Sequence, residues 1–545
     1  MIMSKDTKRR ILLNDVLLRE SGQVEAGGMT LANQYHYIEM MIKGGIDIIE
    51  VGYPASLGNE LQRCRDIVSF VGSMKVKKRP ILSGLARSLD ADILAVKDTG
   101  FEMVHVYIQA SDQLISTQFY DERHGVTLKE KRNWVLRQAV EAVGYAKSLG
   151  FKHIQFSPED AARADREFLC QLVESVIDSG ATSVNIPDTT GICVMNEFGD
   201  LIRHLVATVP NIGRARLACH CHNDTDNATA NALEGALAGV DEVQGTFYGL
   251  GERSGMTKFE SFIMNIQTRQ DVFGSINIEF DSTLSCSLVN FLGAALNITV
   301  PRHWVVVGEQ NSVCSSGTHQ AIEAKAKEMK LPSPYYGWLP ALYGHGPIRT
   351  RITSSSGRAG LAAELKRIGF VLTKEQLDLI FNKVKEISSE RNSNSLQERE
   401  LVAIVNDLLG QDIPCLMIVE KCTIISGKGN NPSAIVVISF GGKVAEANGV
   451  GNGPIDASFV AVTTAAKQLF SALEEYEFFL DGWNPIPVTK GEKSLGDVYA
   501  RIRVTNKVTK KEKIHCGHAV DADTNQAFVQ AFANALSWLA SSLEK

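Results

Sequence analysis

The chain has 545 residues, 44% hydrophobic and 22% charged, which is long enough for two or three domains with substantial cores. Its net charge is −6 and it has no long basic run, so neither nucleic acid nor an anionic membrane is an expected partner, and small molecules are favoured. No apolar run approaches the roughly 18 to 20 residues that a membrane-spanning helix needs. Ten cysteines without CxxC pairs, and an N-terminus without the apolar core of a signal peptide, predict a reducing, cytoplasmic location.

The first half of the chain repeats one unit, in which a short run rich in β-branched residues precedes a longer helical pattern. Eight such runs begin at Ile11, Ile46, Pro80, Met103, His153, Ser183, Arg216 and Glu242. Eight alternating strands and helices predict a (β/α)8 TIM barrel over residues 1–275, with a doubly wound open sheet as the alternative. In such barrels the chemistry gathers at the carboxyl ends of the strands.

After residue 275 this rhythm stops. Residues 276–412 combine a stretch rich in Pro, Gly, Tyr and Ser with a helical pattern, and we interpret them as connector subdomains. Residues 413–545 show strand-like runs followed by a helical pattern, and they do so twice. We therefore predict a C-terminal α+β domain built from two related halves, a design typical of small-ligand binders but one that packing alone could also preserve.

The two halves of this domain show a matching triplet, since Ile455-Asp456-Ala457 resembles Val520-Asp521-Ala522. The glycines in GVGNGPID also resemble a dinucleotide-binding loop. However, no ribose-binding acidic residue follows them in a βαβ frame, so we interpret Gly449, Gly451 and Gly453 as turn and packing residues.

The segment HCHND at residues 220–224 is the first candidate site. Residues two apart in a strand share a face, so His220 and His222 are expected to converge while Cys219 and Cys221 face the other way. At the end of the seventh barrel strand, the two imidazoles would look into the barrel mouth as metal ligands, with Asn223-Asp224 fixing their rings. The alternative is a pair of core histidines satisfied by backbone groups.

The end of the first predicted strand supplies two more candidates. Arg19 and Glu20 are adjacent charges just after an apolar run, and barrel closure would bring them near the seventh strand. A carboxylate with two imidazoles leaves coordination positions open, as a catalytic divalent-metal site requires, and Arg19 would face the charge that develops on a carbonyl oxygen. Taken alone, two such adjacent charges are more often a solvated loop pair.

Seven motifs carry a family resemblance: LLRESGQ…GGMT, EVGYPA, GLAR, FSPEDAARAD, NIPDTTG, HCHND and GLGERSGMTKFE. Their order and spacing resemble the α-isopropylmalate synthase family, whose barrel is shared by homocitrate and citramalate synthases and, more distantly, by hydroxymethylglutaryl-CoA lyases. The resemblance continues into GVGNGPIDA at 449–457, which is similar to the leucine-binding regulatory domain of isopropylmalate synthases.

This resemblance implies a Claisen-type condensation of acetyl-CoA with a 2-oxo acid, followed by thioester hydrolysis. It also implies a divalent cation (Zn, Mg or Mn) held by Glu20, His220 and His222, with Arg19 beside it. The base that removes the methyl proton of acetyl-CoA would be His319, in the signature Ser316-Gly317-Thr318-His319-Gln320, although this histidine could also merely cap or pack a helix.

The resemblance also implies a homodimer, in which His319 reaches the barrel of the partner subunit. There it would be assisted by Glu159 and by Tyr335 or Tyr336. The positions that match the oxo-acid pocket of the family are His105, Ser157 and Thr189, each at a predicted strand end.

The chain departs from the family pattern in several places. Glu20 stands where isopropylmalate synthases usually have Asp, as in homocitrate synthases, and Met256 replaces an Asn that serves as a further metal ligand. The segment with Arg123 also resembles homocitrate synthases, in which a nearby arginine grips the distal carboxylate of 2-oxoglutarate. In addition, CSSGTHQ lacks the usual preceding acidic residue, and Ser355-Ser356-Gly357-Arg358 replaces His-Ser-Gly-Arg.

These observations predict a 2-isopropylmalate synthase-like acyltransferase acting on 2-oxoisovalerate, because the C-terminal domain resembles a leucine sensor with a possible amino-acid effector. Homocitrate or citramalate synthesis is the nearest alternative. A lyase on the same barrel is a second alternative, but such lyases lack residues 415–545. A ligand-sensing paralogue without catalysis is the third.

Overall fold

We describe the protein from a computed structural model. The structure describes residues 8–543 except 21–27, 57, 347, 354–355, 368–369, 371, 391–394, 397–400, 402–403, 406–407, 409–416, 428, 430, 488–495, 510–511 and 522. Residues 21–23 of the first motif, Ser355 and Ala522 therefore lie outside the described residues.

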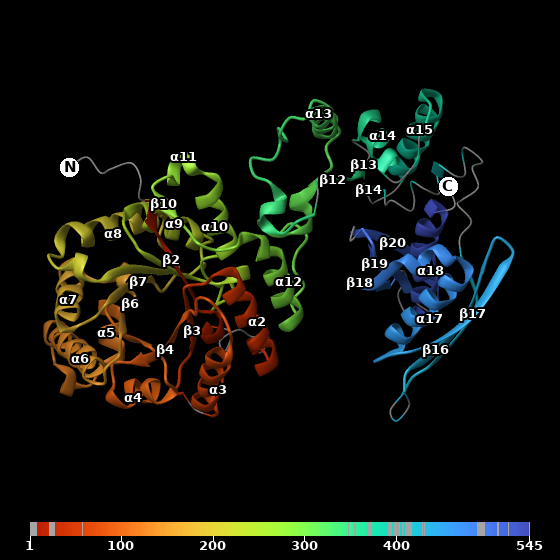
Figure 1. The fold of residues 1–545 in the computed structure, drawn as a ribbon. Coiled ribbons are helices and arrows are strands. Elements are labelled where there is room, and N and C mark those ends of the chain that lie inside the picture. The colour runs from red at the N-terminus through yellow and green to blue at the C-terminus, as the bar shows by residue number, and fades with distance from the viewer. Residues whose placement is uncertain are drawn as a thin grey trace. The chain divides into compact units, whose positions relative to one another are not determined.

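Eight parallel strands close into a barrel, which confirms the predicted fold and excludes the open sheet (Figure 1). Each lies where the sequence predicted a strand, and closure comes from pairing of the first strand with the last, with Leu12 opposite Glu242 and Asp15 opposite Gly245. In order, they are β2 (Leu12–Asp15), β3 (Ile48–Gly52), β4 (Ile81–Arg87), β5 (Met103–Gln109), β6 (His153–Glu159), β7 (Ser183–Asp188), β8 (Arg216–Cys221) and β9 (Glu242–Gly245).

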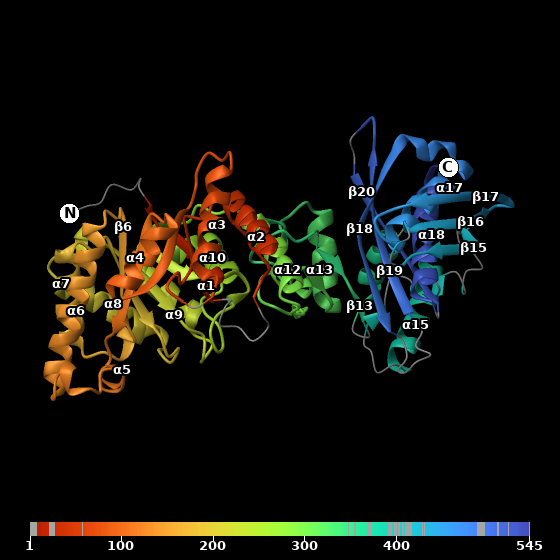
Figure 2. The same ribbon diagram turned by 90° about the horizontal axis from the view of Figure 1, so that it is seen from below.

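Helices surround the barrel on its outside (Figures 1 and 2). Their ends follow ordinary capping chemistry: Thr30 accepts the N–H of Asn33 at one N-terminus, and Thr127 and Glu130 form a capping box at another. The helices are α1 (Leu17–Glu20), α2 (Leu31–Gly44), α3 (Glu60–Ser73), α4 (Asp90–Thr99), α5 (Asp112–Gln118), α6 (Leu128–Ser148), α7 (Arg166–Ser179), α8 (Met195–Thr208), α9 (Ala228–Ala238), α10 (Phe259–Thr268) and α11 (Gln270–Phe273).

The barrel strands divide apolar and polar side chains between their two faces. In β8, Leu217, Cys219 and Cys221 belong to the large apolar core between strands and helices, whereas His220 points to the inside of the barrel. The inside also buries polar side chains from the other strands: Asn14, Glu50, His105, Gln155, Asn185, Glu242 and Gln244. A fully buried Leu or Phe contributes about 1.5–3 kcal/mol, more than the net 0.5–1.5 kcal/mol of a typical hydrogen bond, so the outer layer supplies most of the stability.

The chain forms two compact units, Met1–Cys314 with Lys325–Thr350, and Ser315–Ala324 with Arg351–Lys545. Besides the barrel, the first unit contains α12 (Ser285–Ala295) and two short parallel pairs, β1 (Arg9–Arg10) with β10 (Ile276–Asn277) and β11 (Val313–Cys314) with β12 (Arg349–Thr350). Helix α13 (Gly317–Glu328) begins in the second unit. The predicted domain boundaries after residues 275 and 412 stay predictions.

The second unit has two apolar cores. The smaller core involves β13 (Ile352–Thr353), β14 (Ser395–Leu396), α14 (Arg358–Arg367) and α15 (Lys374–Glu390). The larger core joins two halves of the same architecture, each an antiparallel three-stranded sheet with one helix on it. Their elements are β15 (Ile418–Ile425), β16 (Ser433–Phe440), β17 (Lys443–Val450) and α17 (Pro454–Leu469), then β18 (Tyr476–Pro487), β19 (Gly496–Asn506), β20 (Glu512–Asp521) and α18 (Thr524–Leu543).

These halves confirm the predicted internal repeat but correct the alignment of its triplets. Ile455-Asp456-Ala457 lies inside α17, whereas Val520 and Asp521 end β20, so the similar letters occupy different elements. The glycines before them are the better match, because each lies against its own helix. A Cβ on Gly449 would lie 2.3 Å from the Ala457 carbonyl oxygen, and one on Gly517 would lie 1.8 Å from that of Ala531.

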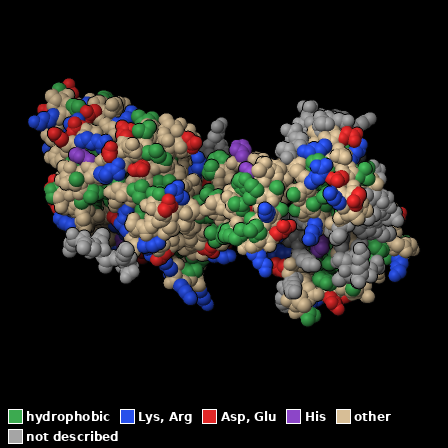
Figure 3. All heavy atoms as spheres, turned by 90° about the horizontal axis from the view of Figure 1, so that it is seen from above, with side chains coloured by type: hydrophobic (Ala, Val, Ile, Leu, Met, Phe, Trp, Pro, Cys, Tyr) green, Lys and Arg blue, Asp and Glu red, His purple; other side chains and the backbone are tan. Residues whose placement is uncertain are grey.

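Among the described residues, no helix is both long and apolar enough to cross a membrane. Basic and acidic side chains are interspersed over the barrel on the face that Figure 3 shows.

Asp15, at the end of β2, is fully buried and packs against α2. Its Oδ2 accepts a hydrogen bond of 2.8 Å from the Tyr37 hydroxyl, and its Oδ1 accepts one of 3.3 Å from the N–H of Leu17. Burial outweighs these hydrogen bonds and raises the pKa of the Asp15 carboxyl to about 7. The folded protein therefore holds this proton more tightly than the unfolded chain does.

From this raised pKa we predict that the protein loses stability as the pH rises from about 4, the ordinary value for Asp, to about 7. Asp15→Asn removes this titration. The unfolding midpoint of the variant minus that of the wild type should therefore increase across this pH window and stay constant above it. Denaturant or thermal midpoints between pH 4 and 8 measure the difference. Asp200→Asn, at an exposed ion pair with Arg203, is the control without such a trend, and a pH-independent difference for Asp15→Asn would contradict the prediction.

Candidate metal centre and active site

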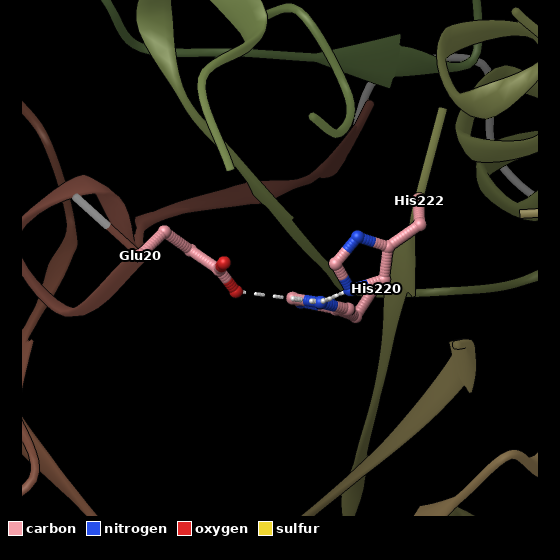
Figure 4. A group of neighbouring side chains, drawn as sticks. All are labelled: Glu20, His220 and His222. Atoms are coloured by element: carbon pink, nitrogen blue, oxygen red, sulfur yellow. Dashed lines mark hydrogen bonds and ion pairs between the residues drawn. The ribbon is translucent and has the colours of Figure 1, made fainter. Parts of the chain in front are cut away.

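Glu20, His220 and His222 meet at the carboxyl end of the barrel strands (Figure 4). Glu20 ends the short helix α1 directly after β2, His220 lies in β8, and His222 follows that strand. One ligand atom from each residue lies within 4.8 Å of the other two, and all three side chains are buried. The His220 Nε2 atom is 3.2 Å from His222 Nε2 and 3.9 Å from Glu20 Oε1. The sequence predicted this convergence from the spacing of the two histidines and from barrel closure.

The charge states of the three groups suit a cation. Burial opposes ionisation of Glu20, but the adjacent Arg19 guanidinium and the N–H of Glu252 favour it, and the pKa of this carboxyl lies below its usual value. Burial lowers the pKa of His220 to about 3, with a contribution from His222, and also lowers the pKa of His222. At neutral pH the cluster thus offers one carboxylate and two uncharged imidazoles, the deprotonated state that metal binding requires.

The donor set also fits a divalent cation. The Nε2 atoms of the two imidazoles face each other beside a buried carboxylate, and such a set is typical of sites for Zn²⁺, Mn²⁺ or a similar ion, with positions left open for a substrate.

Arg19 lies between two buried carboxylates. Its Nη1 atom pairs with Glu20, and its Nε donates a hydrogen bond of 2.7 Å to Glu50 Oε1. The other Glu50 oxygen pairs with Nδ1 of His105, whose Nε2 is 2.6 Å from the Ser157 hydroxyl. Two of the residues predicted to line an oxo-acid pocket, His105 and Ser157, are therefore joined through Glu50 to Arg19 and the candidate metal centre.

The charges in this network stabilise one another. Burial disfavours the ionised form of Glu50, yet His105 and Arg19 outweigh burial and hold the pKa of Glu50 well below its usual value. Burial likewise opposes the positive charge of Arg19, but Glu20 and Glu50 raise its pKa. A permanently charged guanidinium is thus held beside the candidate metal centre.

Glu159 and Thr189 lie at the ends of neighbouring strands. Glu159 ends β6, and its Oε2 accepts a hydrogen bond of 2.7 Å from Gln109; burial raises the pKa of this carboxyl despite that bond. The hydroxyl of Thr189 accepts a hydrogen bond of 2.9 Å from the N–H of Asp160, and its carbonyl accepts one of 2.7 Å from Arg253. Thr189 thus follows a strand end, as the sequence predicted, and both residues lie at the carboxyl end of the barrel strands.

The remaining predicted site residues belong to other elements of the chain. Arg123 is exposed on a 3-10 turn (Glu122–His124) and pairs with Asp121 at 3.6 Å. Tyr335 and Tyr336 belong to the first unit, and His319 lies on α13 in the second unit. Their catalytic and binding roles stay predictions.

Met256, the residue that departs from the family pattern, is buried next to the candidate metal centre. Its backbone forms an antiparallel bridge with His222. A Cβ on Gly251 would lie 3.4 Å from Met256 Cγ and 3.5 Å from Glu20 Oε2, so the methionine and the carboxylate border the same glycine. A thioether is a poor ligand for a hard ion, so Met256 does not add a fourth suitable donor to the three predicted ligands.

Comparison with known proteins agrees with this geometry. Residues 10–290 match the HMGL-like family model, and residues 395–540 match that of the LeuA allosteric (dimerisation) domain. The 2-isopropylmalate synthase of Dictyoglomus turgidum (strain DSM 6724 / Z-1310) is 31% identical over 97% of this chain and 98% of its own length. That of Syntrophus aciditrophicus (strain SB) is 30% identical over 98% of this chain and 96% of its own. This chain belongs to the α-isopropylmalate synthase family.

Among solved structures, hydroxymethylglutaryl-CoA lyase from Pseudomonas aeruginosa aligns with a TM-score of 0.43 and 18% identity, covering 54% of this chain and 95% of its own. The match of residues 395–540 to the LeuA domain lies in the second unit, where the two βββα halves are found. Membership of the family thus rests on both parts of the chain.

Sequence reasoning missed two residues of the site, Glu50 and Gln244. Glu50 is the one polar residue of the buried strand IIEVG, and Gln244 alternates with apolar residues in EVQG, where Glu242 is also polar. Polar residues in such buried strands were the available signal. Gln244, rather than Asn223 or Asp224, contacts the His220 ring. The chain turns away after His222, so that Asn223 accepts the N–H of Ala228 at the start of α9 and Asp224 pairs with Arg253.

Because Glu50 neutralises a buried guanidinium, we predict that Glu50→Gln destabilises the first unit by about 3–5 kcal/mol, the usual cost of breaking a buried ion pair. Thermal or denaturant unfolding measures it. Asp112→Asn is the matched control, since it removes one partner of the more exposed Arg132 pair, for which the expected cost is at most about 1 kcal/mol. Equal losses in both variants would show that burial of the Glu50 pair has no special effect.

Proposed function

We propose that the protein condenses acetyl-CoA with a 2-oxo acid and releases CoA, with 2-oxoisovalerate as the substrate and 2-isopropylmalate as the product. The observation that carries this proposal is the meeting of Glu20, His220 and His222 beside Arg19 at the catalytic end of the barrel. The full-length similarity to curated 2-isopropylmalate synthases supports the same reaction. The LeuA-type match at residues 395–540 favours a synthase over a lyase.

In the proposed reaction, the methyl carbon of acetyl-CoA forms a bond to the keto carbon of the oxo acid, and the keto oxygen takes up negative charge. Arg19 is placed to stabilise that charge, since its own charge is maintained by Glu20 and Glu50. A divalent cation bound by Glu20, His220 and His222 would supply Lewis-acid polarisation of the carbonyl group. His105, Ser157 and Thr189 would contact and orient the oxo acid.

Two proton transfers accompany the carbon–carbon bond. We assign removal of the methyl proton to His319, on the family resemblance of its Ser-Gly-Thr-His-Gln signature, with Tyr335 or Tyr336 assisting. Glu159 would act as the acid–base group on the barrel side, since burial raises the pKa of its carboxyl towards the operating range. Water then hydrolyses the thioester, which releases CoA as a free thiol together with the branched hydroxy diacid.

The arginines at the catalytic end support a substrate whose side chain is uncharged. Each pairs with a carboxylate of its own chain: Arg19 with Glu20 and Glu50, Arg87 with Asp92, Arg163 with Asp160, and Arg253 with Asp224. The second carboxylate of 2-oxoglutarate would have to compete with one of these pairs. This consideration favours 2-oxoisovalerate, and Arg123 would bind the distal carboxylate only if the substrate were 2-oxoglutarate.

The C-terminal domain supports an assembly and a regulatory role. Its match to the LeuA allosteric (dimerisation) domain favours a homodimer with an amino-acid effector, for which leucine is the first candidate. In such a dimer, His319 would serve the barrel of the partner subunit.

An assay with a panel of oxo acids tests the proposed reaction. Purified protein with a divalent cation and acetyl-CoA should release free thiol fastest with 2-oxoisovalerate, and Arg19→Gln should lower kcat/KM by at least about 100-fold, as expected for loss of a group that stabilises the developing charge. Leucine added to the same assay tests the effector.

A response only to 2-oxoglutarate or to pyruvate would overturn the assigned substrate. Release of acetyl-CoA or acetoacetate from a hydroxyacyl-CoA, without condensation, would overturn the synthase class in favour of a lyase. Absence of turnover together with absence of metal uptake would favour the non-catalytic paralogue.

Metal removal gives an independent prediction. His222→Ala and Glu20→Ala should each abolish stoichiometric uptake of Zn²⁺ or Mn²⁺, measured by elemental analysis after dialysis, because each deletes one of three ligands. His204→Ala, at an exposed histidine near Cys170, is the matched control and should bind like the wild type. Retention of one ion per chain in both ligand variants would show that the cation, if present, lies elsewhere.

A further inference from the structure

The orientation of the His220 ring depends on one hydrogen bond inside the barrel. Nδ1 of His220 lies 2.8 Å from Oε1 of Gln244, a carbonyl oxygen that can only accept. The proton of the neutral ring must therefore be on Nδ1. The lone pair on Nε2 is then directed towards His222 and Glu20.

The amide of Gln244 is itself held in one orientation. Its Nε2 donates a hydrogen bond of 2.8 Å to Oε1 of Gln155, and the Nδ2 group of Asn185 approaches its Oε1 at 3.4 Å. If the amide were reversed, its oxygen would face Oε1 of Gln155, and its NH2 group would face the donor Nδ2 of Asn185. The nitrogen of Gln244 therefore stays on the Gln155 side.

A carboxylate at the opposite end of the barrel fixes the direction of this chain of hydrogen bonds. Nε2 of Gln155 donates a bond of 2.8 Å to Oε1 of Glu242, the first residue of β9, and Asn14 donates another of 2.8 Å to the same oxygen. Carboxylate oxygens accept and do not donate, so Gln155 must direct its N–H towards Glu242 and its carbonyl towards Gln244. His220 thus donates to Gln244, Gln244 to Gln155, and Gln155 to the accepting carboxylate of Glu242, and all four side chains are buried.

We propose that Gln244 is a positioning residue that holds His220 in the tautomer protonated on Nδ1, and that Gln155 and Glu242 impose this orientation on Gln244 across the barrel. The inference rests on the proposed function, because it assigns the free Nε2 of His220 to the divalent cation. His222 has no comparable support, since its Nδ1 lacks a hydrogen-bond partner among the described residues. Of the two imidazoles, His220 is thus the ligand that is oriented before the cation arrives.

The test compares Gln244→Met with Gln244→Glu, two changes of similar size. Methionine removes the acceptor for Nδ1–H, so the affinity for Zn²⁺ or Mn²⁺, measured by competition with a chromophoric chelator, should fall about 10- to 100-fold. Glutamate keeps an acceptor facing His220, so affinity should stay within about threefold of the wild type, although thermal stability falls because its second oxygen faces that of Gln155. Gln34→Met, at a buried glutamine that donates to the Met29 carbonyl, controls for loss of any buried amide.

A second readout needs no metal. In metal-free protein labelled with ¹⁵N-histidine, the His220 signals, assigned by their loss in His220→Ala, should report the Nδ1–H tautomer in the wild type and a mixture in Gln244→Met. If Gln244→Met does not fold, Gln155→Met replaces it and should give a smaller shift in the same direction. Unchanged tautomer and unchanged affinity in the methionine variants would overturn the proposal. If the wild type binds neither Zn²⁺ nor Mn²⁺, but the Nδ1–H tautomer is lost in Gln244→Met, then the proposed function is wrong and the positioning role of Gln244 still holds.

Discussion

The pairing of Arg19 with Glu20 and Glu50 is the interaction on which the site depends. Three charged groups are removed from water at the end of a barrel, and each would be costly there without the others. Their mutual attraction keeps the carboxylates ionised and the guanidinium charged, and this state is the one that cation binding and oxyanion stabilisation require. The electrostatic character of the site is therefore already established in the folded protein.

Much of this arrangement follows from local patterns in the sequence. The alternation of strands and helices predicted the closed barrel, and the spacing of His220 and His222 predicted a shared face. Closure of β2 against β9 then accounts for the position of Glu20, because it brings the loop after the first strand near the seventh strand. These predictions needed only periodicity and the rule that parallel strands end at one edge.

The partners inside the barrel could not be predicted in the same way. Glu50 and Gln244 are visible in the sequence as polar residues in buried strands, but each also contacts a strand that is not the next one in the chain, Glu50 through His105 and Gln244 through Gln155, and side-chain length decides which groups meet. The predicted equivalence of the triplets in the C-terminal repeat was wrong for a related reason, since Ile455 lies in a helix and Val520 in a strand. Similar residues alone do not show where each strand ends. The glycines that allow close strand–helix contact follow a constraint of backbone geometry and give the better alignment.

Side chains of two different kinds alternate along strand β8 and the residue that follows it. Imidazoles at His220 and His222 belong to the inner side, and thiols at Cys219 and Cys221 belong to the apolar layer beneath the helices. Deleting or inserting one residue early in this strand would exchange the two sets. The cysteine thiols would then face the inside of the barrel, and the imidazoles would be buried in the apolar layer. A replacement that preserves the length of this segment leaves both sets on their own sides, whereas a change of length alters the two sets together.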